Sequence, residues 1–322
     1  MINSEKLNKN LIGALKDKLA YEKHARLASE LMDILSIGKE AIYRRLRNEV
    51  PFTFAEAALI AKKLGISLDT IVGVSLSKNI SFELIQTRYT DPEEKDYFQL
   101  REYLDVVKTA RGDKNSEYVY ASNVFPQYPG FLYRHLTRFY SFKWWYQNTN
   151  MNDVRLYDES KVPEDLIEIR KEIMNETMNI QNTCYIWNNA IFSSVVKDIK
   201  YFHSLGFLNE EDSRMLKEEL NSLVGDLEFI ATKGMFKTGN KVQVYICNTD
   251  FDATYCYLKT PNFKVSMIGA FSNYINALDD EAYERMVSWT QSLKKLSTLI
   301  SESGEIQRAQ FFKKQREIVS LL

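Results

Sequence analysis

Apolar residues in the first 75 positions recur at the three- and four-residue spacing of short amphipathic helices. In the first twenty residues leucines lie four apart, which predicts a helix over 1–20 built on Leu7, Leu11, Leu15 and Leu19. The same reasoning predicts four further helices, over 26–35, 39–47, 54–64 and 68–72. Five short helices in so short a segment predict a compact all-α domain over residues 1–75.

The fourth of these helices carries boundary signals at both ends. Thr53 is a good N-cap, and Glu56 three residues later completes a capping box. Gly65 follows the last apolar position, where a glycine in the left-handed conformation commonly ends a helix. Pro51 prevents the third helix from continuing smoothly into the fourth.

A larger second domain is expected beyond residue 93. Residues 76–92 are predicted to connect the two domains, and segment 80–89 fits either a short strand or a helix. Helical patterns dominate the rest, apart from a polar, turn-rich stretch at 111–127. The predicted helices span 93–110, 129–148, 163–204 with one possible break, 209–232, 280–302 and 304–321.

Between residues 241 and 268 the apolar period changes from that of a helix to that of a strand. Segment 241–248 alternates, with Val242, Val244 and Ile246 on one face, and 253–259 and 263–268 are two more β-prone runs. Turn-rich segments separate the runs, which predicts a three-stranded antiparallel meander. The expected fold class is therefore mainly α, with a small meander inside the larger helical domain, 93–322.

A helix-turn-helix pattern lies between Leu31 and Leu46. Such a motif needs apolar residues that hold two helices at a fixed angle, and these are Leu31, Leu35, Ile37, Ile42 and Leu46. The start of the second helix would reach base edges in the major groove, and later residues would reach phosphates. Taken alone, a basic amphipathic helix also fits an ordinary solvated surface. The predicted DNA-binding residues are Gly38, Lys39, Glu40, Tyr43, Arg44 and Arg47.

The segment IGKEAIYRRLRNEVPFTFAEAALIAKKLGISLDTIVG extends this pattern through two more helices. It resembles the lambda-repressor/Cro-like helix-turn-helix family, in a form similar to that of Bacteroidetes regulators. The resemblance covers about residues 7–73 and implies a five-helix DNA-binding domain. Three positions depart from the family pattern: Met32 replaces a small residue, Ser36 replaces the turn glycine, and Gly38 replaces a Ser or Thr cap.

The charge distribution fits a mildly basic nucleic-acid module joined to an acidic domain. Residues 1–73 carry 12 Lys and Arg against 9 Asp and Glu, a net charge of +3, whereas the whole chain has a net charge of −1. The opening MINSEKLNKN lacks the apolar segment of a signal peptide, and no apolar stretch is long enough to span a bilayer. We therefore expect a cytoplasmic protein with no membrane part.

Residues capable of catalysis or metal binding do not form a recognisable motif. Cys184, Cys247 and Cys256 lack metal-ligand spacing and are expected to be reduced, semi-buried thiols. The histidines, His24, His135 and His203, have no Cys or Ser partner at catalytic-motif spacing, and Asp250 and Asp252 fit a hairpin turn. We expect no enzyme activity, no metal and no cofactor.

The second domain offers candidates for association and sensing. The aromatic run around Trp144 and Trp145 fits a core or a dimer contact better than a single-strand stacking platform. We expect a homodimer held mainly by residues beyond 93. A small-molecule effector is a possible further partner, with Ser301 and Arg308 as polar contacts at a helix junction that also fits simple capping. Together with the resemblance, these features predict a transcription regulator that binds double-stranded DNA sequence-specifically as a dimer. The alternative is an antitoxin-like assembly module whose helix-turn-helix does not primarily regulate.

Overall fold

The computed structural model describes residues 4–18, 24–72, 82–85, 92–125, 127–148, 157, 162–270, 273–277 and 280–322. The chain divides into two compact units, Met1–Ile80 and Ser81–Leu322, which we call the N-terminal and the C-terminal unit. Each is described separately below, and most of the predicted connection, 76–92, lies outside the described residues.

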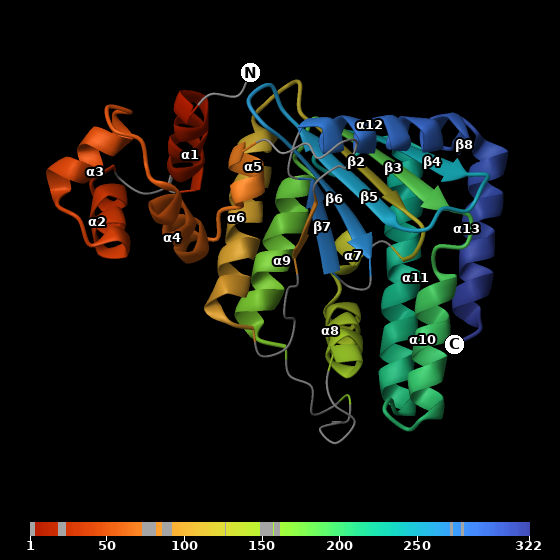
Figure 1. Ribbon diagram of the computed structural model, residues 1–322. Coiled ribbons are helices and arrows are strands. Elements are labelled where there is room, and N and C mark those ends of the chain that lie inside the picture. Colours follow the sequence, from red (N-terminus) through yellow and green to blue (C-terminus); the bar gives the residue numbers. More distant parts are fainter. Residues whose placement is uncertain are drawn as a thin grey trace. The chain divides into compact units, whose positions relative to one another are not determined.

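The N-terminal unit consists of helices α1 (Ser4–Lys18), α2 (His24–Leu35), α3 (Lys39–Leu46), α4 (Phe54–Leu64) and α5 (Leu68–Val72) (Figure 1). Helix α2 packs against both α3 and α4, and α1 packs against α5. One apolar core joins them, formed by Leu11, Leu15, Leu27, Ala28, Leu31, Ile42, Ile60 and Ile71. Of the predicted apolar positions, Leu11, Leu15, Leu31 and Ile42 are in this core, since they share one face of each helix. Leu7 is only half-buried, and Leu19 lies outside the described residues.

Local capping signals operate in this unit as the sequence predicts. The Thr53 hydroxyl accepts a hydrogen bond from the Glu56 amide, and the Glu56 carboxylate accepts one from the Thr53 amide at 2.7 Å. Gly65 ends α4 with a φ of 64°, the left-handed conformation that glycine adopts at low cost. The capping box and the glycine cap of α4 are confirmed.

The C-terminal unit is built on one eight-stranded mixed sheet with the order β1-β7-β6-β5-β2-β3-β4-β8. Strand β3 pairs in parallel with β2 on one side and with β4 on the other. Every other strand pairing in the sheet is antiparallel. The strands are β1 (Phe82–Ile85), β2 (Glu117–Ser122), β3 (Asn182–Asn188), β4 (Lys241–Cys247), β5 (Thr254–Lys259), β6 (Lys264–Ala270), β7 (Asn273–Ala277) and β8 (Ser297–Leu299).

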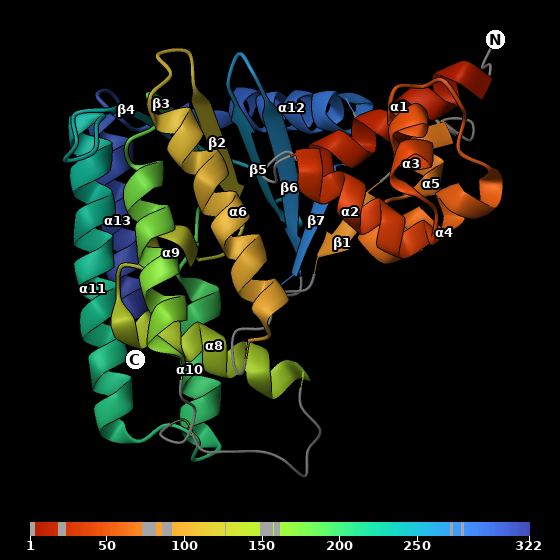
Figure 2. The ribbon, with the colours of Figure 1, turned by 90° about the vertical axis from the view of Figure 1, so that its left-hand side faces the viewer.

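Helices cover both faces of this sheet, unequally. Helix α12 (Asp280–Lys295) lies on one face, over Val119, Ala121, Cys184 and Ile186 (Figures 1 and 2). The other face carries the larger core, packed under α6 (Glu94–Arg111), α7 (Gln127–Gly130), α8 (Arg134–Asn148), α9 (Glu164–Thr177), α10 (Ser193–Ser204), α11 (Glu210–Lys233) and α13 (Glu305–Ser320). The described part of this unit is thus a layered α/β structure.

The predicted fold class is wrong, because a large sheet replaces the expected small meander. Strand β3 interrupts the helix predicted over 163–204, β2 lies in the stretch predicted to be polar turns, and β8 ends the helix predicted over 280–302. Of the three predicted strands, only the second and third, β5 and β6, are neighbours. The first, β4, pairs with β3 and β8 and not with β5, which follows it in the sequence. Pairing between strands that are distant in sequence here outweighs proximity along the chain.

The aromatic run of α8 belongs to the monomer's own core. Phe139 and Phe142 are fully buried, and Trp144 and Trp145 are 5% and 8% exposed. The Phe142 ring packs edge-on against Phe202 of α10, with the ring centroids 5.1 Å apart. These side chains therefore stabilise the helical layer and are not accessible to a second copy of the chain or to a nucleic acid.

Candidate nucleic-acid interface

Helices α2 and α3 form the two arms of the predicted helix-turn-helix. The turn between them depends on Ser36, which has a φ of 54°, and its amide donates a hydrogen bond to the Met32 carbonyl at 2.8 Å. Glycine is favoured at such a position because a side chain is strained in the left-handed conformation. Ser36 thus adopts a left-handed backbone conformation that glycine would adopt at lower cost.

Gly38 is the N-cap of α3, with an extended backbone at φ −67° and ψ 156°. Glycine caps acceptably but supplies no side-chain oxygen for the first amides of the helix. The first backbone amides of α3 therefore have no side-chain acceptor at the cap. The N-terminal end of a helix, where such amides lie, is the end that stabilises a phosphate.

The side chains of α3 divide between the core and solvent as the helical period requires. Ile42 is fully buried, and Tyr43 and Leu46 are half-buried against the same core. Lys39, Glu40, Arg44 and Arg47 are exposed, and the Lys39 ammonium lies 5.9 Å from the centroid of the Tyr43 ring. The structure therefore brings the predicted DNA-binding residues together on and beside one exposed helix, with Gly38 at its start.

Arg45, the middle arginine of RRLR, has a different role. Its Nη2 donates to Oε1 of Glu56 at 2.7 Å and its Nε donates to Oε2 at 3.3 Å. Both side chains are only 16% exposed, so this pair links α3 to the first turn of α4. Burial alone would raise the pKa of Glu56, but hydrogen bonds from Thr53 and Arg45 outweigh burial and lower it. The two residues are eleven apart in the sequence, and no local pattern indicates that they pair.

Glu49 binds both of the exposed arginines. Its carboxylate accepts a hydrogen bond from Arg47 Nε at 2.6 Å and lies 3.6 Å from Arg44 Nε. Arg47 also donates to Glu40 at 3.2 Å. The hydrogen bonds that Arg47 donates, first to Glu49 and second to Glu40, raise the pKa of Arg47. The hydrogen bond from Arg47 lowers the pKa of Glu49. In the free protein, carboxylates thus occupy the cations that a phosphate would bind.

The loop between α3 and α4 is held by a buried asparagine of α1. Asn8 is 6% exposed, and its amide nitrogen donates to Asn48 Oδ1 at 2.6 Å. Its own Oδ1 accepts the Phe52 amide at 2.9 Å, while Asn48 has a φ of 61°. Asn8 therefore fixes the loop that carries Glu49. The only feature of the sequence that indicates this role of Asn8 is a polar residue within an otherwise apolar face of the helix.

Ser301 and Arg308, the candidate effector contacts, lie at the start of α13. Ser301 is 2% exposed, and its hydroxyl accepts the Val244 amide at 3.1 Å. The Arg308 guanidinium donates to the carbonyls of Ile300 at 2.7 Å and Ser303 at 3.2 Å. Both side chains use their polar atoms to bind the backbone of this junction, and they do not line either of the two cavities described in the C-terminal unit.

The remaining candidate residues are dispersed. Cys184, Cys247 and Cys256 are buried and form no disulfide, and burial raises the pKa of Cys184 to about 11 and that of Cys256 to about 12. Asp250 accepts a hydrogen bond from the Asn188 amide at 2.6 Å. Across the described ranges, no three His, Cys, Asp or Glu side chains are grouped so as to hold a metal ion. None of the helices described is both long and apolar enough to cross a bilayer.

Comparisons of the chain with protein-family profiles, with curated proteins and with solved structures find no match.

Proposed function

We propose that the chain is a transcription regulator that binds double-stranded DNA sequence-specifically, with α3 as its recognition helix. One observation carries the proposal. Of the cationic residues on α3 and at its C-cap, Arg45 is bound within the unit by Glu56, while Lys39, Arg44 and the C-cap Arg47 are exposed, and Ile42 anchors the opposite side in the core. A short helix fixed on one side and cationic on the other suits insertion into the major groove.

Within this proposal, the exposed residues have different roles. Lys39, Glu40 and Tyr43 lie in the first half of α3, which in a helix-turn-helix reaches base edges. Arg44 and Arg47 lie in the second half, where a guanidinium contacts either phosphate or guanine. The resemblance to lambda-repressor/Cro-like domains supports this assignment, since that family uses the corresponding helix.

A homodimer follows from the same mechanism. One α3 helix buries little surface on DNA, and helix-turn-helix regulators gain affinity by placing two such helices one DNA turn apart. We propose that residues beyond 93 provide the two-fold contact. A regulator of this class acts on genomic DNA, so we expect it in the cytoplasm of a bacterial cell.

The proposal is tested by gel-shift titration of genomic fragments at several salt concentrations, with the full chain and three variants. Arg44→Ala and Arg47→Ala should each weaken binding by about 1–3 kcal/mol if the arginine reads a base, and each should reduce the salt slope by about 1 if it contacts phosphate. Lys313→Ala removes one exposed charge from α13 and serves as the control. The proposal fails if both arginine variants bind like the wild type and remain folded by circular dichroism.

An assembly module, like an antitoxin, is the second candidate. It is favoured by two large apolar side chains exposed on α4, Phe54 at 81% and Leu59 at 49%. Exposed apolar side chains of this size are common at protein contacts. A double substitution of Phe54 and Leu59 by Ala separates the candidates: a DNA regulator keeps its gel shift, whereas an assembly module loses a protein partner in a pull-down.

A further inference from the structure

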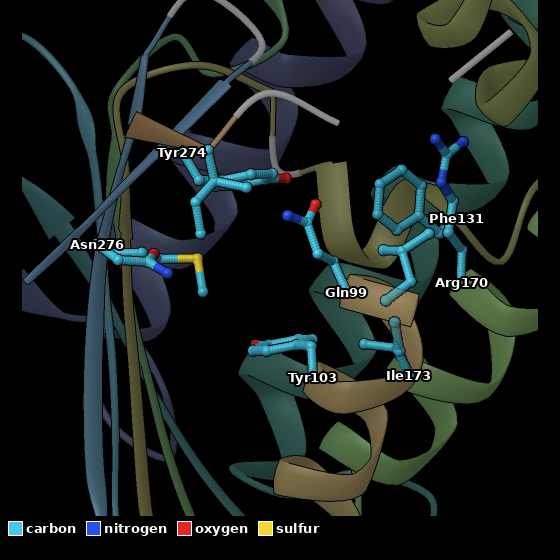
Figure 3. A pocket seen from close by; sticks show the side chains of 10 residues that line it. Gln99, Tyr103, Phe131, Arg170, Ile173, Tyr274 and Asn276 are labelled. Atoms are coloured by element: carbon cyan, nitrogen blue, oxygen red, sulfur yellow. The ribbon is translucent and has the colours of Figure 1, made fainter. Parts of the chain in front are cut away.

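A cavity of about 120 Å³ lies in the C-terminal unit between strands β1, β6 and β7 of the sheet and helices α6 and α9. Gln99 and Tyr103 approach it from α6, Ile173 from α9, and Met267, Tyr274 and Asn276 from strands β6 and β7. Figure 3 shows Gln99 and Tyr103 directed toward the sheet, and Tyr274 and Asn276 directed toward the helix. These side chains face one another because alternate residues of β7 point to the helical face of the sheet.

Gln99 is the polar group that distinguishes this cavity from a packing defect. Its Oε1 atom is fully buried, and within the described part of the chain it has no hydrogen-bond partner. Leaving a buried carbonyl oxygen without a donor is unfavourable, and native structures rarely do so without a ligand or water at the site. The end of the Gln99 side chain lies between α6 and β7 (Figure 3).

Apart from Asn276 and Arg170, the remaining walls are apolar or aromatic. Tyr103, Tyr274, Met267 and Ile173 line the cavity together with Gln99. An apolar cavity of about 150 Å³ accommodates a benzene molecule, so this one, which is about 120 Å³ and partly open to solvent, admits at most a single six-membered ring. A ring bound here would contact aromatic and sulfur-containing side chains, which interact favourably with it.

The polar group that a ligand beside Gln99 would contact, the Gln99 carboxamide, is uncharged. Arg170 borders the same space and is only 2% exposed, but its Nη1 donates to Ser141 Oγ at 3.2 Å, and its guanidinium carbon lies 5.1 Å from the centroid of the Phe131 ring. Figure 3 shows the guanidinium beyond Phe131, on the side away from Tyr274 and Asn276. A ligand seated beside Gln99 therefore contacts the carboxamide, and the Phe131 ring lies between it and the guanidinium.

We propose that this cavity binds a small, uncharged, single-ring aromatic carboxamide or lactam. Such a molecule donates an N–H to Gln99 Oε1 and accepts the Gln99 Nε2–H through its own carbonyl. This is the paired geometry by which a glutamine side chain recognises the adjacent donor and acceptor of adenine. The ring then occupies the apolar space next to Tyr103 and Met267. Gln99 is a specificity-determining residue and the site is one for binding, with no chemical step.

The test uses the full-length protein with benzamide, toluene and benzoate as probes, in calorimetric titration and thermal-shift assays. Benzamide should bind and raise the melting temperature as its concentration increases, because it binds only the folded state. Toluene, which lacks the amide, should bind more weakly, and benzoate should bind least, because its charge has no partner beside Gln99. The proposal is overturned if benzamide fails to bind at millimolar concentration or if benzoate binds more tightly.

Two variants and a control identify the site. Gln99→Leu should weaken benzamide binding about ten-fold or more while leaving toluene binding unchanged or tighter, because only benzamide uses the carboxamide. Met267→Phe fills the cavity and should abolish binding of both probes. Gln310→Leu, on the exposed surface of α13, should bind both as the wild type does. Equal benzamide affinity in Gln99→Leu and the wild type contradicts the proposal. None of these measurements involves DNA, so their failure is distinguishable from failure of the proposed function.

Discussion

The Arg45 guanidinium and the Glu56 carboxylate share two hydrogen bonds, at 2.7 and 3.3 Å, across the junction of α3 and α4. Glu56 also accepts the Thr53 amide that begins α4, so one carboxylate serves a capping box and an ion pair. Arg44, the residue before Arg45, is exposed instead. Adjacent arginines on one short helix therefore differ: Arg45 is paired within the unit, and Arg44 is exposed and has a role only in the proposed DNA binding.

Arg45→Ala should destabilise the N-terminal unit by about 1–3 kcal/mol, because it leaves a largely buried carboxylate with fewer donors. Arg44→Ala should change stability by no more than about 0.5 kcal/mol, as is usual at an exposed position. Hydrogen exchange of the α3 and α4 amides in the full chain measures both. Equal protection in the two variants would show that the Arg45–Glu56 pair contributes nothing.

The acid stability of the N-terminal unit should depend on Glu56. Its folded-state pKa lies below the usual 4.5, so the unfolded chain binds this proton at a higher pH than the folded chain does. The stabilisation is fully present above pH 4.5 and is lost as the pH falls through the folded-state pKa. Glu56→Gln should therefore lower stability at neutral pH and flatten the dependence on pH below 4.5. Urea midpoints from the α4 amides, measured from pH 3 to pH 7, test this. Parallel pH curves for variant and wild type would exclude Glu56 as the titrating group.

Ser36→Gly should stabilise the N-terminal unit by about 0.5–1 kcal/mol. Ser36 holds a φ of 54°, which costs a residue with a side chain more than it costs glycine. Ser36→Ala provides the comparison, since it keeps the Cβ atom and should bring no gain. The difference in urea midpoint between the two variants measures the effect. A Gly variant no more stable than the Ala variant would mean that the turn is unstrained.

The N-terminal unit follows its sequence closely because its signals are local. Helix α3 was predicted over 39–47 and spans Lys39–Leu46, and the capping residues of α4 function as expected. Apolar spacing, a capping box and a glycine cap each act within a few residues. Asn8 and the Arg45–Glu56 pair were missed, because their partners lie on other elements.

The C-terminal unit departs from its sequence prediction because its sheet depends on long-range pairing. In β3, Cys184, Tyr185, Ile186 and Trp187 are all buried, since both faces of the strand are covered. A strand buried on both faces shows no alternation and has the apolar content of a buried helix. The cavity beside Gln99 is lined by residues from both helices and strands, so no local motif indicates it.

Two glycines of the C-terminal unit should respond oppositely to alanine. Gly304 caps α13 with a φ of 67°, and a Cβ atom there would lie 2.6 Å from the Leu299 carbonyl oxygen. Gly304→Ala should therefore destabilise this unit by about 2 kcal/mol or more. Gly225 lies within α11, where an added Cβ atom would meet nothing within 4 Å, so Gly225→Ala should stabilise the unit by about 0.5–1 kcal/mol. Chemical denaturation followed by tryptophan fluorescence reports this unit, because the chain's four tryptophans lie in it. A shift of the same sign in both variants would contradict the backbone assignment at Gly304.

If α3 binds DNA as proposed, Glu49 should weaken that binding. It accepts a hydrogen bond from Arg47 and lies beside Arg44, so both arginines must leave it before they reach phosphate. It also places a negative charge next to a negatively charged partner. Glu49→Gln should therefore tighten binding to any DNA sequence by about three- to ten-fold at low salt, an effect that screening reduces as salt increases.

The control is Glu5→Gln on α1, which removes an equal charge from a carboxylate paired with Lys9 instead of with an arginine of α3. Gel-shift titrations of both variants at two salt concentrations separate a local effect from a change in net charge. If the two substitutions tighten binding equally, overall charge is the cause, and Glu49 has no special relation to the recognition helix. If Glu49→Gln alone tightens binding and the gain disappears in the Glu49→Gln, Arg47→Ala double variant, the contact between Glu49 and Arg47 accounts for it. That outcome would also locate the bound DNA at the exposed side of α3, because a carboxylate can compete with phosphate only where the phosphate binds.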